Sequence, residues 1–308
     1  MTKEEATPAS LPGRGSRDRW EEVGLRLLLG GLRILPEGIS VRTAATVTSG
    51  FGRIAGNLRQ IGLANLAIAF PEKSEAWREA TLQDTFANLG RLAAEFAHFP
   101  QLNETNIGSR VRFASAADEQ RWGQTIARGS SIMATGHFGN WEMLLQAHGL
   151  WGKPVTVVYR NAKNPLVDKI ITDIRQRHGN QMFPKRSAAR VLLRGLRAGK
   201  LIALPIDQRE AGGKGVPVPF FGRLAATTLG PARLSQLAQI PLQVMVIARR
   251  GKSLQHEIVV QEPIAPPPKR DKDPELLIAT MEKVHASYED CIRRYPSQWL
   301  WVHQRWRP

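Results

Sequence analysis

The stretch Ala134-Thr135-Gly136-His137-Phe138-Gly139-Asn140-Trp141-Glu142 marks the point where an apolar segment gives way to a helical pattern. The residues that lead into it, 131–134, are mostly apolar and short enough for a buried strand, and an apolar helical pattern follows at 143–150. Two glycines separate these patterns, as expected for a tight turn. Such a strand-to-helix corner is where α/β folds place ligands and catalytic groups, and this corner carries polar side chains.

The corner contains a histidine and a glutamate five residues apart. On one continuous helix His137 and Glu142 would lie about 140° apart. If His137 instead ends the strand and Gly139 or Asn140 caps the helix, Glu142 falls in the first helical turn, and we expect its carboxylate to reach back to the imidazole. A carboxylate on one ring nitrogen makes the other nitrogen a competent general base. The alternative interpretation is a buried histidine beside a helix-terminal glutamate.

The rest of the chain predicts an α/β fold with a mostly parallel central sheet flanked by helices. We expect strands at 154–159, 201–204, 242–248 and 257–260, and helices at 116–128, 165–177, 187–198, 227–239 and 273–294. Three helical patterns precede them, at 17–35, 40–70 and 74–99. We predict a disordered tail at 1–16 and a single domain at 17–308, in which helices at 17–99, with a capacity to associate with membranes, precede an α/β catalytic core at 100–308.

The composition points to an anionic partner. The 308 residues carry a net charge of +16, which suits a nucleic acid, a membrane surface, or a phosphorylated or carrier-bound substrate. The single cysteine, Cys291, excludes disulfides within the chain and zinc sites of several cysteines. No apolar run reaches the ~20 residues that span a bilayer. The basic amphipathic segment 17–35, which includes Trp20, fits a membrane interface as well as it fits packing on its own domain.

Basic residues are concentrated soon after the corner. Between Arg160 and Lys200 eleven lysines and arginines stand against two aspartates. Many must be solvated helix faces, but their place in the sequence also suggests an anion-binding wall beside the His137 corner.

Several motifs together resemble one family. The stretch from Gly136 to Glu142 resembles the His-X4-Asp/Glu motif of the lipid A late acyltransferases, the lauroyl and myristoyl transferases of glycolipid biosynthesis. The other similar segments are Asn65–Glu72, Tyr159-Arg160 with Asn164-Pro165-Leu166, Pro205-Ile206-Asp207-Gln208, Val218–Gly222 with Ala226-Thr227-Thr228, and Trp299–Trp306. The resemblance runs from about Leu28 to Arg307 with the motifs in family order. Family members usually begin with a membrane-anchoring helix, whereas arginines interrupt that region here.

This resemblance implies an enzyme with a glycerolipid-acyltransferase-like fold. Its reaction would move an acyl chain from an acyl carrier protein thioester, or acyl-CoA, to a hydroxyl of an anionic glycolipid, a lipid A precursor of lipopolysaccharide. The expected partners are acyl carrier protein, that glycolipid and the inner-membrane surface, with no nucleic acid. The expected location is the cytoplasmic face of the inner membrane, attached peripherally or weakly. No metal and no cofactor besides the thioester are expected.

The resemblance also assigns roles to residues. His137 would take the proton from the acceptor hydroxyl, and Glu142 would orient the imidazole. The backbone near Gly139 or a guanidinium would stabilise the oxyanion. We assign the following residues to substrate binding: Gly139, Asn140, Arg160, Arg175 and Asp207. Within this set Arg175 is the candidate for a phosphate or the developing charge, and Asp207 would anchor an arginine or position substrate.

Other interpretations remain open at this point. The acceptor can be another lysolipid or glycolipid, because motif residues report the reaction and not the acceptor. A thioesterase would use the same pair, His137 and Glu142, to activate water. It would need no acceptor site, which leaves the basic wall unexplained. The two weakest alternatives are a non-enzymatic membrane- or nucleic-acid-binding protein and a zinc hydrolase. The C-terminal tryptophans, Trp299, Trp301 and Trp306, fit either a membrane interface or packing on the sheet.

Overall fold

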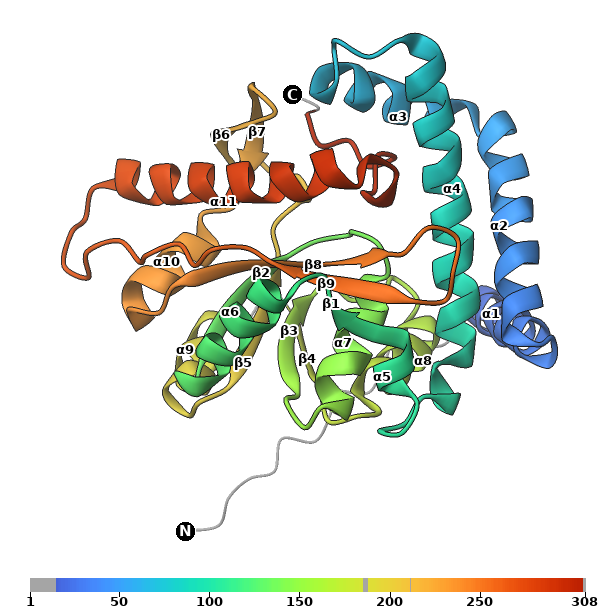
Figure 1. Cartoon of the computed structure of the whole chain (residues 1–308), viewed down its shortest axis with the longest axis horizontal. Helices are drawn as coiled ribbons and strands as arrows, with labels where there is room; N and C mark the ends of the chain where they lie inside the picture. The colour runs from blue at the N-terminus through green and yellow to red at the C-terminus, as the bar shows by residue number, and fades with distance from the viewer. Residues whose placement is uncertain (1–14, 185–187, 211, 307–308) are drawn as a thin grey trace.

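The computed structural model describes residues 15–184, 188–210 and 212–306, and its centre is a seven-stranded sheet (Figure 1). The strand order is β1-β9-β8-β2-β5-β3-β4. The strands are β1 (Val111–Phe113), β2 (Ser131–Thr135), β3 (Val155–Tyr159), β4 (Gln181–Pro184), β5 (Leu201–Pro205), β8 (Leu242–Arg249) and β9 (His256–Val260). The run from β8 to β4 is parallel throughout, and only β9 pairs antiparallel, with β8. The predicted mostly parallel α/β sheet is confirmed.

Both faces of this sheet are covered by helices. Ile132 and Ala134 of β2 pack in a core with α9 (Ala188–Arg197), α10 (Gly230–Ala238) and α11 (Pro274–Arg294), whereas Met133 packs with α6 (Ala116–Ala127) and α7 (Trp141–Leu150). Helix α8 (Pro165–Gln176) lies on the α7 side. Figure 1 shows α11 running along the side of the sheet opposite α7. Burial on both faces explains why β8 is buried at every position and is mostly apolar, with Gln243 and Arg249 as its polar residues.

The N-terminal third is helical, as expected. It contains α1 (Ser16–Ile34), α2 (Glu37–Ile54), α3 (Gly56–Ala69) and α4 (Glu75–His98), followed by the short η1 (Phe99–Gln101) and α5 (Ile107–Arg110). The single pattern at 40–70 proves to be two helices, because Ala55 leaves the helical region with a ψ of 62°. Helix α4 lies beside α2 (Figure 1) and joins this layer to the sheet. The tail predicted at 1–16 falls almost entirely outside the described residues.

A two-stranded hairpin was not predicted. Its strands, β6 (Val216–Phe220) and β7 (Arg223–Thr227), are joined by Phe221 and Gly222, which both have positive φ, as the tight hairpin turn requires. The helix expected from residue 227 therefore begins only at Gly230. Strand β6 packs on α11.

The chain end packs on this hairpin. Short η3 (Pro296–Gln298) leads into a segment where the side chains of Trp299, Trp301 and Trp306 are buried. The rings of Trp299 and Trp306 pack against Phe220. Packing, rather than a membrane interface, is therefore their role. Throughout the described ranges, every helix falls short of the length and hydrophobicity that crossing a bilayer requires.

Candidate active site

The loop after β2 and the loop after β5 meet at one edge of the sheet. These strands are parallel neighbours in which Thr135 pairs with Pro205, so the chain leaves both strands in the same direction. The N–H of Ile206 donates to the carbonyl oxygen of Thr135 at 2.8 Å. This pairing brings Asp207, two residues beyond β5, next to His137, two residues beyond β2.

Asp207 holds His137 by two hydrogen bonds. Nδ1 of His137 lies 3.0 Å from Oδ1 of Asp207, and the His137 backbone N–H donates to Oδ2 at 2.7 Å. The indole N–H of Trp299 also donates to Oδ2, at 3.0 Å. Burial alone would raise the pKa of Asp207, but the charge of His137 and these hydrogen bonds lower it to about 2. Asp207 is therefore an ionised carboxylate that fixes the imidazole.

The other ring nitrogen of His137 faces outward. Nε2 lies 3.4 Å from the amide nitrogen of Gln208, and a quarter of the His137 side chain is exposed (25%). Burial lowers the pKa of His137, but the carboxylates of Asp207 and Glu142 outweigh it and raise that pKa above its ordinary value. With Nδ1–H donated to Asp207, Nε2 carries the lone pair. The arrangement can accept a proton from a group bound at the loop.

Glu142 occupies the expected helical turn but has a different partner. Asn140 caps α7 as predicted, because its Oδ1 accepts the Met143 N–H at 3.0 Å. The Glu142 carboxylate forms a two-bond ion pair with Arg175 of α8, with Nε to Oε2 at 2.8 Å. The expectation that Glu142 binds the imidazole is wrong in this structure, since Asp207 occupies Nδ1 and the guanidinium fork matches the Glu142 carboxylate better. Glu142 acts on His137 through its charge and through Trp141, whose indole N–H donates to Glu142 and whose ring packs against the imidazole.

Two residues assigned to the substrate instead hold the loop in place. The N–H of Gly139 donates to the carbonyl oxygen of Gln298 at 2.7 Å, so it does not serve an oxyanion. Gly139 has a φ of +56°, and a Cβ there would lie 1.8 Å from the carbonyl oxygen of Ile247. The Asn140 side chain is fully buried and donates to Glu95 at 2.7 Å. Asp207 likewise contacts His137 and Trp299 rather than an arginine.

Two basic residues of the predicted anion-binding wall form ion pairs with carboxylates of this chain. Arg175 pairs with Glu142, and Lys169 pairs with Asp173. Arg160 is exposed just after β3, and its role in substrate binding stays a prediction. The other exposed members are Lys163, Arg177, Arg190, Arg194, Arg197 and Lys200. Lys185 and Arg186 lie outside the described residues.

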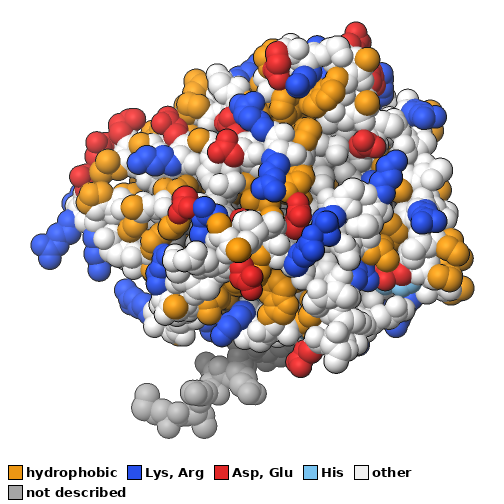
Figure 2. Space-filling model, viewed as in Figure 1, with side chains coloured by type: hydrophobic (Ala, Val, Ile, Leu, Met, Phe, Trp, Pro, Cys, Tyr) orange, Lys and Arg blue, Asp and Glu red, His pale blue; other side chains and the backbone are white. Residues whose placement is uncertain are grey.

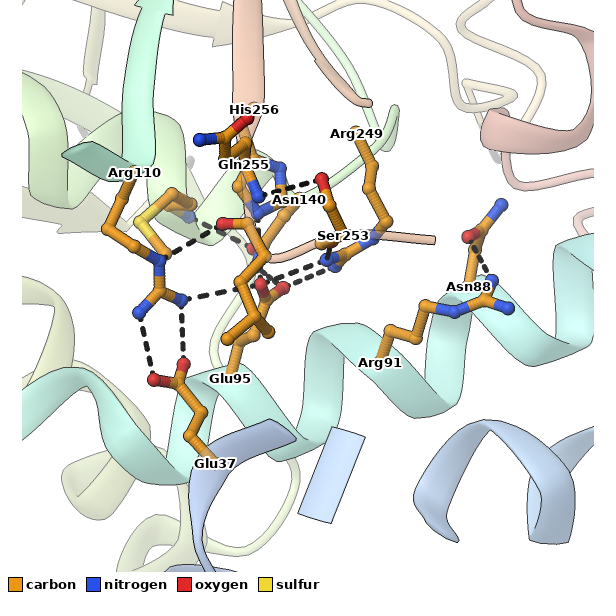
Figure 3. Close-up of polar contacts among 12 residues, drawn as sticks. Glu37, Asn88, Arg91, Glu95, Arg110, Asn140, Arg249, Ser253, Gln255 and His256 are labelled. Atoms are coloured by element: carbon orange, nitrogen blue, oxygen red, sulfur yellow. Dashed lines mark hydrogen bonds and ion pairs between the residues drawn. The ribbon is translucent and has the colours of Figure 1, made fainter. Parts of the chain in front are cut away.

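A second buried charge network behind the motif was not predicted. Glu95 of α4 is fully buried and pairs with Arg249 at the end of β8 and with Nε2 of His256 at 3.0 Å (Figure 3). Arg110 lies 3.6 Å from Glu95 and pairs with Glu37 of α2. These partners come from distant parts of the sequence, so no local pattern finds them. The available signal was a glutamate inside the apolar face of α4 and an arginine closing a buried strand.

No group of three or more His, Cys, Asp or Glu side chains that could hold a metal ion occurs in the part of the chain that the structure describes.

Comparison with known proteins places this site in a family context. Residues 22–308 match the family described as bacterial lipid A biosynthesis acyltransferase. The chain is 26% identical over 245 residues to the lipid A biosynthesis lauroyltransferase of Escherichia coli K12. This alignment covers 79% of this chain and 77% of that protein. The chain is 24% identical over 220 residues to the lipid A biosynthesis myristoyltransferase of the same organism, covering 70% and 66%. It is also 26% identical over 212 residues to a phosphatidylinositol mannoside acyltransferase of Mycobacterium tuberculosis, covering 66% and 65%.

Proposed function

This chain belongs to the bacterial lipid A biosynthesis acyltransferase family, and from that premise we propose that it transfers a fatty acyl chain from an acyl thioester to a hydroxyl of a lipid A precursor or a related glycolipid. The observation that carries the proposal is His137, which is held at Nδ1 by buried Asp207 and leaves Nε2 open. The mannoside acyltransferase relative supports including other glycolipid acceptors.

In the proposed reaction His137 is the general base. Nε2 takes the proton from the acceptor hydroxyl as its oxygen forms a bond to the thioester carbonyl carbon. Asp207 balances the charge of the imidazolium and keeps Nδ1 protonated. The tetrahedral intermediate then breaks its C–S bond, and the thiolate recovers the proton from His137. The acyl chain moves directly to the acceptor, without an acyl-enzyme.

The ion pair of Glu142 and Arg175 has a separate role in this proposal. Arg175 is close enough to His137 to lower the pKa of the imidazole, and Glu142 is close enough to raise it. We assign Arg175 to the oxyanion or to an acceptor phosphate, and Glu142 to holding its guanidinium in place. The side chains of Arg175 and Glu142 are only 21% and 6% exposed. The surrounding protein therefore holds both groups in position before substrate binds.

The proposed partners are acyl carrier protein, the anionic acceptor and a membrane surface on the cytoplasmic side. Apolar side chains are exposed along α1 at seven-residue spacing, on one helical face: Trp20 (74%), Leu27 (71%) and Ile34 (84%). On α2 the side chains of Val47, Phe51 and Ile54 are exposed as well. Figure 2 shows hydrophobic side chains at the edge where α1 and α2 lie. An apolar helix face on a protein of charge +16 suits an anionic lipid surface.

The test follows label from an acyl carrier protein thioester, with and without the tetraacylated lipid A precursor. We expect transfer to the glycolipid, lowered at least about 10²-fold by His137→Ala. The exposed Lys283→Gln on α11 serves as the matched control and should be unchanged. Release of free fatty acid at the same rate with or without acceptor would instead establish a thioesterase. Co-sedimentation with anionic vesicles, lost in a Trp20→Ser, Leu27→Ser variant, tests the membrane surface.

A further inference from the structure

Arg91 carries a buried positive charge that no carboxylate contacts, although the charges of Asp84 and Glu95 act on it from a longer distance. It lies on α4, one turn before Glu95, and is only 8% exposed. Its Nη1 donates to the Asn88 side-chain oxygen at 2.6 Å. Among the residues that the structure describes, no carboxylate forms an ion pair with Arg91. Burial lowers the pKa of Arg91 more than these two carboxylates raise it, so a bound anion would stabilise its charge.

The neighbouring carboxylate is already balanced by other cations. Glu95 and Glu37 face two arginines, Arg249 and Arg110, while His256 stays neutral because burial lowers its pKa. Figure 3 shows the Arg91 side chain extending toward Asn88, away from the Glu95 carboxylate. The charge of Arg91 is therefore additional to a network that is already neutral.

Arg91 lines a pocket of about 680 Å³ between α4 and the turn that joins β8 to β9. That turn adds two exposed cations, Arg250 and Lys252. Two carboxylates also line the pocket: Asp84 is exposed, and Glu257 lies 3.8 Å from Arg250 and accepts a hydrogen bond from Tyr295. Cations remain in excess, and the volume suits a small polar group rather than a single ion.

Hydrogen bonds connect this pocket to the catalytic loop. The Asn88 amide, which orients Arg91, donates to the carbonyl oxygen of Ser297 at 3.0 Å. The next residue, Gln298, bonds the backbone of Arg249 at 2.6 and 2.9 Å, and its own carbonyl oxygen accepts the Gly139 N–H. One wall of the pocket is thus the segment that also supports the His137 loop.

We propose that this pocket, which we name the Arg91 pocket, binds a phosphate ester of a substrate. The inference rests on the proposed acyl transfer, which involves phosphorylated molecules on both sides. Arg91 supplies a preoriented guanidinium, and Arg250 and Lys252 close over the phosphate from the turn. The phosphate belongs either to the glycolipid acceptor or to the phosphopantetheine arm of the donor. Both present the same oxyanion chemistry.

The first experiment measures phosphate binding without turnover. Inorganic phosphate, exchanged for chloride at constant ionic strength, should raise the melting temperature of the wild-type protein and of the inactive His137→Ala variant. We expect Arg91→Gln to melt no lower than wild type in phosphate-free buffer, because it removes a buried charge that no carboxylate contacts, yet to lose the increase with phosphate. Lys252→Gln, an exposed change, should reduce the increase, and the control Lys283→Gln should keep it. Equal increases in wild type, Arg91→Gln and Lys252→Gln would overturn the proposal.

The second experiment identifies the substrate that carries the phosphate. With the phosphorylated acceptor, Arg91→Gln should raise KM on the order of tenfold at nearly constant kcat, and a dephosphorylated acceptor should show no such change. The same rise in the donor KM alone would assign the pocket to the phosphopantetheine arm. Unchanged KM for both substrates would overturn the proposal while leaving acyl transfer intact. Phosphate-dependent melting without any turnover would overturn the proposed function and leave the Arg91 pocket standing.

Discussion

Two carboxylate–imidazole pairs adjoin the motif loop, with the same contact distance and different surroundings: Asp207 contacts His137, and Glu95 contacts Asn140. Asp207 lies 3.0 Å from Nδ1 of His137, and Glu95 lies 3.0 Å from Nε2 of His256. The ion pair of Asp207 is with the imidazole of His137, whose pKa it raises. Glu95 has Arg249 and Arg110, and burial, together with those arginines, lowers the pKa of His256. The charges around a histidine therefore decide its chemistry more than its nearest carboxylate does.

The largest expected effect concerns the carboxylate that holds the proposed base. Asp207→Asn should lower kcat by roughly 10²–10⁴-fold, because Nδ1 loses its acceptor and the imidazolium its counterion. Glu142→Gln should cost less, since Glu142 does not contact the imidazole. Steady-state rates of both variants, with circular dichroism as the folding control, test this order. A greater loss in Glu142→Gln would restore the expectation drawn from the motif alone.

The corresponding change in the second pair should affect stability instead. Glu95→Gln leaves buried arginines without their counterion, and we expect the free energy of unfolding to fall by about 3–5 kcal/mol. The exposed Glu282→Gln on α11 is the matched control. Urea unfolding measures both variants. If Glu95→Gln has the same urea midpoint as the wild type, the Glu95 network does not stabilise the fold.

The pH dependence of the reaction separates the two histidines. The proposed base must be neutral, so kcat/KM should rise with pH through the raised pKa of His137. In Asp207→Asn burial remains and the carboxylate is gone, which should move the midpoint to lower pH. The same raised pKa stabilises the folded state below the ordinary pKa of 6.5, and this contribution is lost as pH rises through the folded-state pKa. Identical midpoints for variant and wild type would contradict the pairing.

The smallest effect is expected at the structural histidine. His256→Gln retains a side-chain donor for Glu95 and removes no charge, so unfolding should become easier by only about 1 kcal/mol. Its rate profile against pH should match that of the wild type. A shifted midpoint would mean that His256 titrates with the reaction, and the contrast between the two pairs would fail.

The sequence predicted the elements whose patterns are local. The mostly apolar strand β8 and the helix α8, which Asn164 caps, were predicted to within one residue of their ends. The hairpin β6–β7 was missed because prolines at 217 and 219 weaken a strand pattern. The break at Ala55 was missed because an alanine gives no stop signal.

The site was predicted as far as the motif reaches. His137 and the helix cap at Asn140 follow from neighbouring residues, whereas the partner of His137 depends on which strands adjoin. Only the pairing of β2 with β5 brings Asp207 to the imidazole. Asp207 was predicted to anchor an arginine or to position substrate. Glu95 and Arg91 were not predicted, because their partners come from distant parts of the sequence.

The close approach at Gly139 sets a limit on how this chain can diverge. Its missing Cβ would fall 1.8 Å from the carbonyl oxygen of Ile247, and at Gly136 a Cβ would fall 2.3 Å from the Tyr288 hydroxyl. In a saturation-mutagenesis library, both codons should therefore accept synonymous changes only. A substitution of Gly139 would require the backbone of β8 at Ile247 to move first. We therefore expect position 139 and the end of β8 to change together in evolution.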